Sequence, residues 1–158
     1  MVSGVPLPSQ PGSYALVFEI SREVQVHIGR AGLHLFPAGT YIYAGSAHGS
    51  GGLRARIAHH LRAASRPHWH LDYLFPHAIA RCCYYTVNEV KIECEWSHLL
   101  AGLPGARVVM PGFGSSDCRA GCLTHLYHWD RPLDETALFT NLTLSKLIVS
   151  TQRLNFVV

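Results

Sequence analysis

The feature that most constrains the fold is a change in hydrophobic period part-way along the chain. Residues 14–20 are apolar and β-prone, and residues 24–28 alternate between apolar and polar side chains. This period of two predicts strands. Over residues 53–64 apolar side chains recur every fourth position instead, which predicts an amphipathic helix. A chain that passes from strands to helices in this way belongs to the α/β or α+β class.

The remaining elements can be predicted in the same way. Residues 41–44 form a third strand, residues 78–87 form a buried strand with little alternation, and residues 90–101 form a second helix. The shorter predicted elements are a hairpin joining 14–20 to 24–28, a turn-like segment at 29–35, a short helix or turn at 71–75, and strands at 107–110 and 123–129. We therefore expect a small mixed or antiparallel sheet flanked by helices.

The length of 158 residues favours a single domain with its own core. Residues 1–11 are rich in Pro, Ser and Gly and predict a flexible arm, so the domain is expected over residues 12–130. Residues 131–158 form a C-terminal extension of ambiguous structure, in which a helix could be capped near Asp134. The N-terminus lacks the pattern of a signal peptide, and no apolar stretch reaches the ~20 residues of a membrane span. The expectation is a cytoplasmic globular protein without membrane contact.

Positive charge is concentrated in one part of the sequence. No acidic residue occurs between Glu23 and Asp72, whereas five arginines and several histidines fall inside that stretch. Such a block is typical of a surface for an anionic partner, nucleic acid first. The alternative is an ordinary solvated surface. Within the block, the glycine-rich segment 45–52 precedes the predicted helix, so its amides could cradle a phosphate.

Several ordered motifs carry a resemblance to a known family. Gly12-Ser13-Tyr14 opens the first strand, and Tyr43-Ala44-Gly45 closes the third. Longer runs follow as FPAGTYIYAGSAHGSGGLRARIAHHL at 36–61, HWHLDYL at 68–74, Glu93-Cys94, and GFGSSDCRAGCLTHL at 112–126. Taken alone, each is better explained by packed aromatics or a solvated helix face. As an ordered set, the motifs resemble the GIY-YIG nuclease superfamily, and in particular its small stand-alone branch of unknown function.

The resemblance implies a GIY-YIG-like fold and a metal-dependent endonuclease that hydrolyses phosphodiester bonds. DNA is favoured over RNA, with a role in repair, because the domain occurs fused to a base-excision glycosylase in some proteins. The implied cofactor is Mg²⁺ or Mn²⁺. The catalytic set that the resemblance implies is Tyr14, Tyr43, Arg56, His60 and Glu93, with Glu93 as the metal ligand. Tyr41 and Glu95 are rivals for Tyr43 and Glu93 because they lie two residues away in the sequence.

Physical chemistry is consistent with these roles. Arg56 and His60 are four apart and would share one helix face. A guanidinium can hold two phosphate oxygens, and a carboxylate suits Mg²⁺. The expected nucleic-acid contacts are Gly45, Ser46, Arg54, Arg62, Arg66, His68 and His70. For residues 68–72 two interpretations stay open: phosphate or metal contacts with Trp69 stacking on a base, or a buried Trp with a His–Asp hydrogen bond at the helix end.

The cysteines offer another kind of site. Five cysteines leave an odd thiol in any disulfide scheme, which favours reduced thiols. Cys118, Cys122 and His125, with His128 or Cys94, could supply the four ligands of zinc. The sequence favours packed thiols over zinc, because apolar residues surround them. Two alternatives to a nuclease therefore remain: a nucleic-acid-binding module without robust catalysis, and a zinc-stabilised interaction domain.

Overall fold

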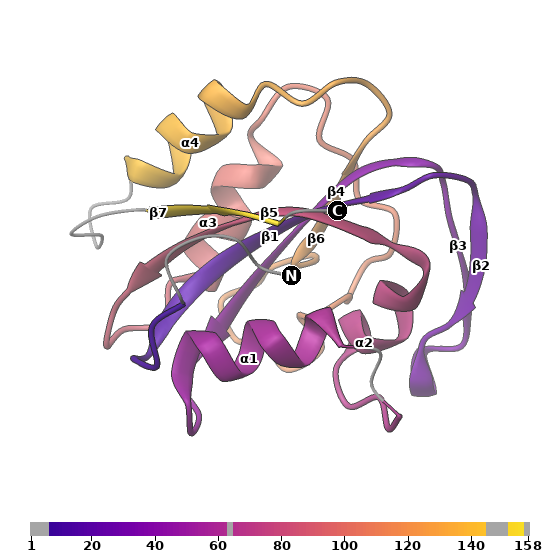
Figure 1. Cartoon of the computed structure of the whole chain (residues 1–158). Coiled ribbons are helices and arrows are strands. Elements are labelled where there is room, and N and C mark those ends of the chain that lie inside the picture. The colour runs from indigo at the N-terminus through magenta and orange to yellow at the C-terminus, as the bar shows by residue number, and fades with distance from the viewer. Residues whose placement is uncertain (1–6, 63–64, 145–151, 157–158) are drawn as a thin grey trace.

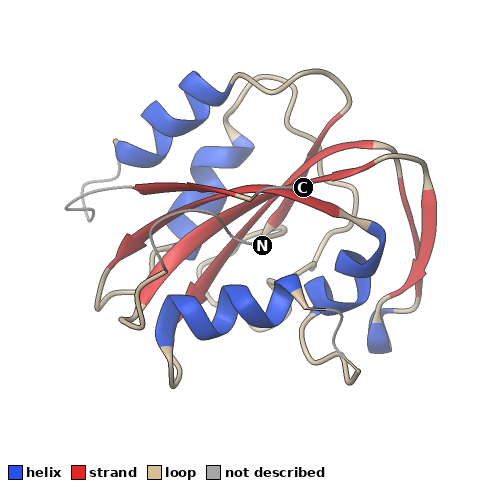
Figure 2. Ribbon diagram, viewed as in Figure 1, coloured by secondary structure: helices blue, strands red, loops and turns tan. Residues whose placement is uncertain are grey.

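A five-stranded antiparallel sheet forms the centre of the fold (Figures 1 and 2). The structure is a computed structural model and describes residues 7–62, 65–144 and 152–156. The strands, in the order in which they lie side by side, are β6 (Leu126–Trp129), β4 (Gly39–Ala47), β1 (Gly12–Ile20), β5 (Ile79–Val87) and β7 (Gln152–Asn155). Strand β1 pairs with β4 on one side and β5 on the other. The predicted α+β class with an antiparallel sheet is confirmed.

Helices cover both faces of this sheet (Figure 1). On one face lie α1 (Gly52–Leu61) and α2 (His70–Leu74), and on the other α3 (Glu93–Ala101) and α4 (Glu135–Thr143). Alternate residues of β1 supply the two cores: Leu16 packs in the cluster that contains Leu53 of α1, and Val17 in the cluster that contains Trp96 of α3. Because both faces are covered, β1 is apolar along nearly its whole length.

The predicted hairpin between residues 14–20 and 24–28 is wrong. Strand β2 (Val24–His27) pairs with β3 (Leu33–Phe36) in a separate two-stranded sheet, with a 3₁₀ turn (Gly29–Ala31) between them. The segment 29–35 therefore contains a strand as well as a turn. The physical reason is that β4 and β5 occupy both edges of β1, so β2 needs another partner. Gly32, with φ of +87°, supplies a turn conformation that other residues rarely adopt.

The later elements agree with the sequence in part. Helices α1 and α3 confirm the predicted helices, although α3 begins at Glu93. The predicted strand at 107–110 is wrong, since Arg107 makes only an isolated bridge to His128. Helix α4 begins after Asp134, whose carboxylate accepts a hydrogen bond from the amide of Ala137 (2.9 Å), as the capping prediction requires. Another 3₁₀ turn (Phe75–His77) precedes β5, and residues 145–151 lie outside the described residues.

Residues 7–11, which the composition assigned to a flexible arm, lie against the start of α1. The carbonyls of Pro8 and Gln10 accept hydrogen bonds from the amides of Arg54 (2.9 Å) and Leu53 (3.1 Å). These are first-turn donors, which have no partner within a helix. The chain itself therefore uses these two amides, which directly follow the segment 45–52 that was expected to cradle a phosphate. None of the described helices has the length and apolarity needed to cross a membrane.

Candidate functional site

The two motif tyrosines lie on the face of the sheet that α1 covers. The register of β1 and β4 places Tyr14 opposite Gly45 and Leu16 opposite Tyr43, and the two tyrosine ring centroids are 6.3 Å apart. Gly45 is required for packing, because a Cβ there would lie 2.5 Å from the Tyr14 ring. Gly45 and Ser46 belong to β4 and not to a loop. The prediction that both tyrosines share one face near α1 is confirmed.

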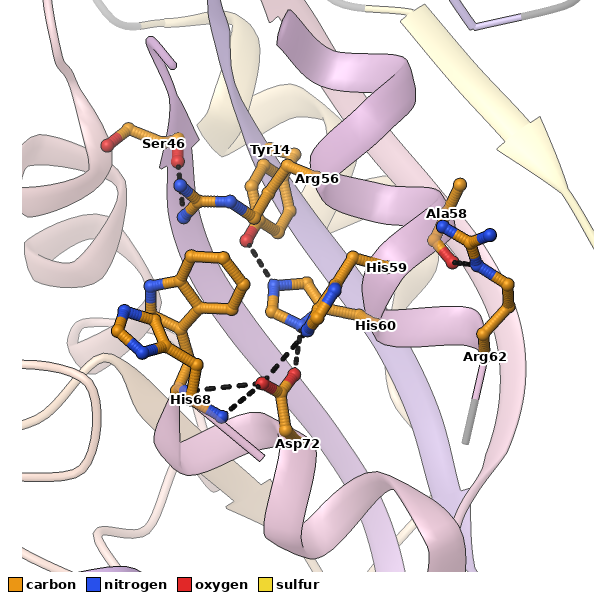
Figure 3. A network of polar contacts seen from close by, with 10 residues as sticks. Tyr14, Ser46, Arg56, Ala58, His59, His60, Arg62, His68 and Asp72 are labelled. Carbon is orange, nitrogen blue, oxygen red and sulfur yellow. Dashed lines mark hydrogen bonds and ion pairs between the residues drawn. The ribbon is translucent and has the colours of Figure 1, made fainter. Parts of the chain in front are cut away.

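A buried chain of hydrogen bonds links Tyr14, His60 and Asp72 (Figure 3). The Tyr14 hydroxyl lies 2.9 Å from His60 Nε2, and His60 Nδ1 lies 3.0 Å from Asp72 Oδ1. The other carboxylate oxygen is 3.0 Å from His59 Nε2 and accepts the amides of His68 and Trp69. Asp72 therefore organises both histidines and the turn before α2. The hydrogen-bond interpretation of residues 68–72 is supported for Asp72.

The pKa directions of Asp72, His60 and Tyr14 indicate which atoms of this hydrogen-bond chain carry protons. Burial alone would raise the pKa of Asp72, but the four donors around it, His60 first, hold that pKa well below its usual range. Burial lowers the pKa of His60 despite the opposing effect of Asp72. At neutral pH a neutral His60 thus donates its Nδ1–H to the carboxylate, and its bare Nε2 accepts the Tyr14 hydroxyl proton. Burial also raises the pKa of Tyr14, with Tyr43 adding to the effect.

Arg56 is held in place from two sides. One guanidinium nitrogen donates a hydrogen bond to the carbonyl of Ser46 (3.2 Å), and the guanidinium carbon lies 4.0 Å from the centroid of the Trp69 ring. Trp69 is half-buried rather than buried. Its ring also makes T-shaped contacts with the imidazole rings of His59 and His60. Stacking on an indole orients the guanidinium while leaving donors available to a ligand.

A cavity of about 800 Å³ opens beside these groups. Tyr43 from β4, Arg56 from α1 and Glu93 from α3 all line it, so three elements distant in sequence meet there. Burial raises the pKa of Tyr43 to about 12; Arg56 opposes the shift and Glu93 adds to it. Tyr43 is therefore a protonated donor at neutral pH. Lys91 and Asp117 also line the cavity, and the sequence analysis did not single them out for it.

Glu93 reaches the cavity because the start of α3 is tied to β1. The Ser13 hydroxyl accepts a hydrogen bond from the amide of Ile92 (3.2 Å), directly before the helix. The Ser13 side chain thus lies on the opposite face of β1 from Tyr14, as alternation along a strand requires. Glu93 Oε2 is buried and has no hydrogen-bond partner among the described residues. Glu93 lines the cavity, whereas its rival Glu95 is not among the lining residues that the structure describes.

The rival tyrosine has a different environment. The Tyr41 hydroxyl donates a hydrogen bond to the carbonyl of Pro37 (2.7 Å), and its ring stacks on Phe18. Burial raises its pKa, with the charge of Glu23 adding to the effect. Tyr41 is thus engaged in packing, and Tyr43 is the better candidate of the two.

The cysteine-containing motif folds into a cluster whose members Cys94, Cys118 and His125 line the same cavity. Cys94, Cys118, Cys122 and His125 place their ligand atoms within 4.8 Å of one another. Cys94 is the fourth member, while the alternative, His128, hydrogen-bonds the carbonyl of Ala38 instead (3.0 Å). Three sulfurs and one imidazole suit zinc far better than Mg²⁺. The preference for packed thiols over a metal site is not supported: this cluster could hold a metal, and zinc is its best match.

The remaining predicted contacts are more scattered. Arg54, Arg62 and Arg66 are exposed. His70 Nδ1 accepts a hydrogen bond from the amide of Gly114 (3.0 Å), so this side chain anchors a loop. His68 and His70 line a separate cavity of about 500 Å³ rather than the one that holds Arg56.

Asp72 is the member of this hydrogen-bond network whose role the sequence left open. Its one signal was the motif HWHLDYL, which left its role open. The contact with His60 spans 12 residues and crosses from α2 to α1, so it depends on tertiary packing.

Comparison with known proteins identifies a family but no characterised relative. A family model described as "Domain of unknown function DUF123" matches residues 13–146. Neither the curated proteins nor the solved structures yielded a match to the chain. The match spans both tyrosine strands, α1, the start of α3 and the cysteine cluster. The chain therefore belongs to the family of the domain of unknown function DUF123.

Proposed function

We propose that the protein is a metal-dependent endonuclease that hydrolyses phosphodiester bonds in nucleic acid, with DNA favoured. The observation that supports this most is the cavity in which Tyr43, Arg56 and the unpartnered carboxylate of Glu93 meet. Cleavage of a phosphodiester requires positive charge at the phosphate, an oxygen ligand for a metal, and a route for the proton of the attacking water. The cavity and the hydrogen-bond chain behind it offer all three.

Glu93 is the residue that would hold Mg²⁺. A buried carboxylate oxygen without a hydrogen-bond partner is costly unless something else satisfies it, and a hard cation bound by oxygen is a suitable partner. When bound, Mg²⁺ would act as a Lewis acid at the scissile phosphate. Tyr43 and Arg56 share the same cavity and would contact the phosphate oxygens, Tyr43 as a neutral donor and Arg56 as a cation.

The hydrogen-bond chain gives the proton a path. The high pKa of Tyr14 means that its hydroxyl is not a base by itself. Tyr14 has no exposed surface and does not line the cavity, so this path requires a local movement that admits water to its hydroxyl. As the attacking water then loses its proton to the Tyr14 oxygen, the Tyr14 proton passes to His60 Nε2. His60 then becomes an imidazolium whose Nδ1–H remains bonded to the Asp72 carboxylate. Asp72 acts as a positioning residue that holds the tautomer and stabilises the charge, a role known from catalytic triads.

Three exposed arginines, none of which lines the cavity, offer a cationic surface for binding. Arg54 lies on α1, and Arg62 and Arg66 follow in the segment after it; all three are exposed. Exposed guanidiniums attract the phosphate backbone without regard to sequence. We expect them to hold the duplex while Arg56, which is half-buried, acts at the scissile phosphate.

The test is a nicking assay on supercoiled plasmid with Mg²⁺. Glu93→Gln should abolish cleavage and leave DNA affinity nearly unchanged, because the carboxylate does not attract DNA. Glu89→Gln is the matched control: it removes the same charge four residues away, at an exposed position, and should cleave like the wild type. Equal cleavage by both variants would show that the site is misplaced. Salt-sensitive DNA binding without any cleavage by the wild type would support a binding module instead.

A further inference from the structure

The cluster of Cys94, Cys118, Cys122 and His125 has the dimensions of a metal centre. Cys94 Sγ lies 3.4 Å from Cys118 Sγ and 3.7 Å from His125 Nε2. With Zn–S near 2.3 Å and Zn–N near 2.05 Å, a tetrahedral zinc site requires about 3.8 Å between sulfurs and about 3.5 Å between sulfur and nitrogen. The observed sulfur–sulfur separation is a little shorter than required, and the sulfur–nitrogen separation is a little longer. Small side-chain rotations would suffice to surround an ion.

The alternatives to a metal fit less well. A disulfide between Cys94 and Cys118 would need a sulfur separation of about 2.05 Å, and it would leave Cys122 and His125 without a role. Thiols that served only to fill space would not need a buried imidazole nitrogen directed at one of them. The other two cysteines, Cys82 and Cys83, do behave as core residues, since they are buried in β5 and lie outside the cluster.

The cluster lies where the chain most needs a cross-link. Between the end of α3 and the start of β6, the described chain contains turns and the isolated bridge at Arg107 but no named helix or strand. Such long connections are uncommon in compact domains unless something orders them. Cys118, Cys122 and His125 come from this connection, whereas Cys94 is the second residue of α3. One ion bound by all four would tie the connection to the helix.

We propose that these four residues bind one Zn²⁺ as a closed structural centre that fixes the cavity wall beside Glu93. Four protein ligands fill the tetrahedron and leave no open position, so the ion does not act on substrate. Three sulfurs select zinc over the hard cations that a carboxylate binds. Cys94 is adjacent in sequence to Glu93, and Cys94, Cys118 and His125 line the same cavity. The centre therefore positions Glu93 without touching the reacting phosphate.

His98 completes the surroundings of the ion. It lies on α3, one turn after Cys94, with Nε2 3.8 Å from Cys122 Sγ. A donor to a ligand sulfur orients that ligand and moderates its charge, and loss of such a partner typically weakens metal affinity by about 10- to 100-fold. His98→Ala should therefore retain zinc at saturation but release it to a chelator at a lower concentration than the wild type does.

The primary test is the metal content of the full-length protein, purified without a histidine tag. Elemental analysis should find about one zinc per chain. Cys118→Ser should lose most of the zinc, and Cys82→Ala, the matched control outside the cluster, should retain it. Cobalt substitution should give the strong visible bands of a tetrahedral site and a near-ultraviolet thiolate band. Any one of three results would overturn the proposal. These are weak octahedral bands from the cobalt protein, wild-type protein without zinc, and zinc that stays in Cys118→Ser but is lost from Cys82→Ala.

A second measurement remains useful if Cys118→Ser does not fold. In the native wild type, a thiol reagent should modify few cysteines until a strong chelator is added, after which the three cluster thiols should react with release of zinc. Immediate reaction with no zinc released would contradict a metal centre. These readouts do not depend on nuclease activity, and Glu93→Gln should keep its zinc. Mg²⁺-dependent cleavage by a zinc-free protein would refute only the zinc centre; zinc with no cleavage would refute only the nuclease.

Discussion

Asp72→Asn tests the role of the hydrogen-bond chain most directly. The Asp72 side chain is fully buried, and its Oδ2 accepts from His59 and two backbone amides while Oδ1 faces His60 Nδ1. An asparagine that keeps its oxygen towards the three donors must turn its NH₂ group towards His60. His60 would then carry its proton on Nε2 and could no longer accept the proton of Tyr14. The substitution changes few atoms, yet it reverses the direction of the hydrogen bonds that link Asp72, His60 and Tyr14.

The expected magnitudes follow from the bonds involved. Where the same substitution traps a triad histidine in the wrong tautomer, kcat falls about 10⁴-fold, so we expect cleavage to fall by about 10³- to 10⁴-fold. Bonds to a charged group contribute about 1 kcal/mol more than neutral ones. A neutral asparagine also costs less to bury than a carboxylate, which offsets part of this loss. The four weakened hydrogen bonds therefore imply that the free energy of unfolding falls by about 2–3 kcal/mol. At roughly 3 °C per kcal/mol for a chain of this size, Tm should fall by about 6–9 °C.

The stability effect should also depend on pH. Because the folded pKa of Asp72 is well below its usual range, its ionised form stabilises the fold at pH values above the unfolded pKa near 3.9. That contribution is lost as pH falls through the folded pKa. The difference in unfolding free energy between wild type and Asp72→Asn should therefore be greatest at neutral pH and diminish below about pH 4.

The assays are plasmid nicking under single-turnover conditions and urea denaturation across pH. Asp130→Asn serves as the control: Asp130 pairs with Arg107 at the surface, where its side chain is 40% exposed, and should change stability by less than about 1 kcal/mol. Cleavage by Asp72→Asn within tenfold of the wild type would refute the proposed proton path. An unchanged Tm would show that the four hydrogen bonds contribute little.

Three further predictions concern packing, binding and pH. Gly45→Ala should destabilise the fold by about 1–3 kcal/mol in urea denaturation, because its Cβ would meet the Tyr14 ring at 2.5 Å, whereas Gly49→Ala meets nothing within 4 Å and should be neutral. If four arginines neutralise phosphates, the slope of log affinity against log salt should be about −3.6, and Arg62→Ala should reduce its magnitude by about 0.9 in fluorescence anisotropy; a salt-independent affinity would contradict this. Cleavage should decline as pH falls through the depressed pKa of His60, since an imidazolium cannot accept another proton, and a rate that rises with acidity would contradict it.

The choice between the candidate tyrosines, and between the candidate carboxylates, depended on the tertiary structure. The sequence offers Tyr41 beside Tyr43 and Glu95 beside Glu93 at a spacing of two. Both tyrosines lie on the same face of β4, so strand periodicity cannot separate them. The structure distinguishes them by what each hydroxyl contacts: Tyr41 donates to Pro37, whereas Tyr43 faces the cavity. Such contacts are set by segments that are distant in sequence.

The cysteine cluster illustrates the same limit. Cys118, Cys122 and His125 are recognisable from their local spacing, but the fourth ligand is not. Cys94 and His128 were both available, at separations of 24 residues before Cys118 and three residues after His125. Only the docking of α3 against the following connection brings Cys94 to Cys118, while the pairing of β6 with β4 turns His128 towards Tyr41.

What the sequence determined by itself is the local structure. Hydrophobic period indicates where the longer strands and helices lie, because each segment must bury an apolar face of its own repeat, but it missed β3 and predicted a strand at 107–110 that does not form. This was sufficient for β1, β4, β5, α1 and α3, and for the shared face of Tyr14 and Tyr43. Tertiary structure alone decided which strands pair, as β2 and β3 show, and that Asp72 lies beneath His60. Strand pairing, and the meeting of side chains from distant segments at one site, depend on competition among those segments for the same sheet edges and buried positions. No local hydrophobic period encodes that competition.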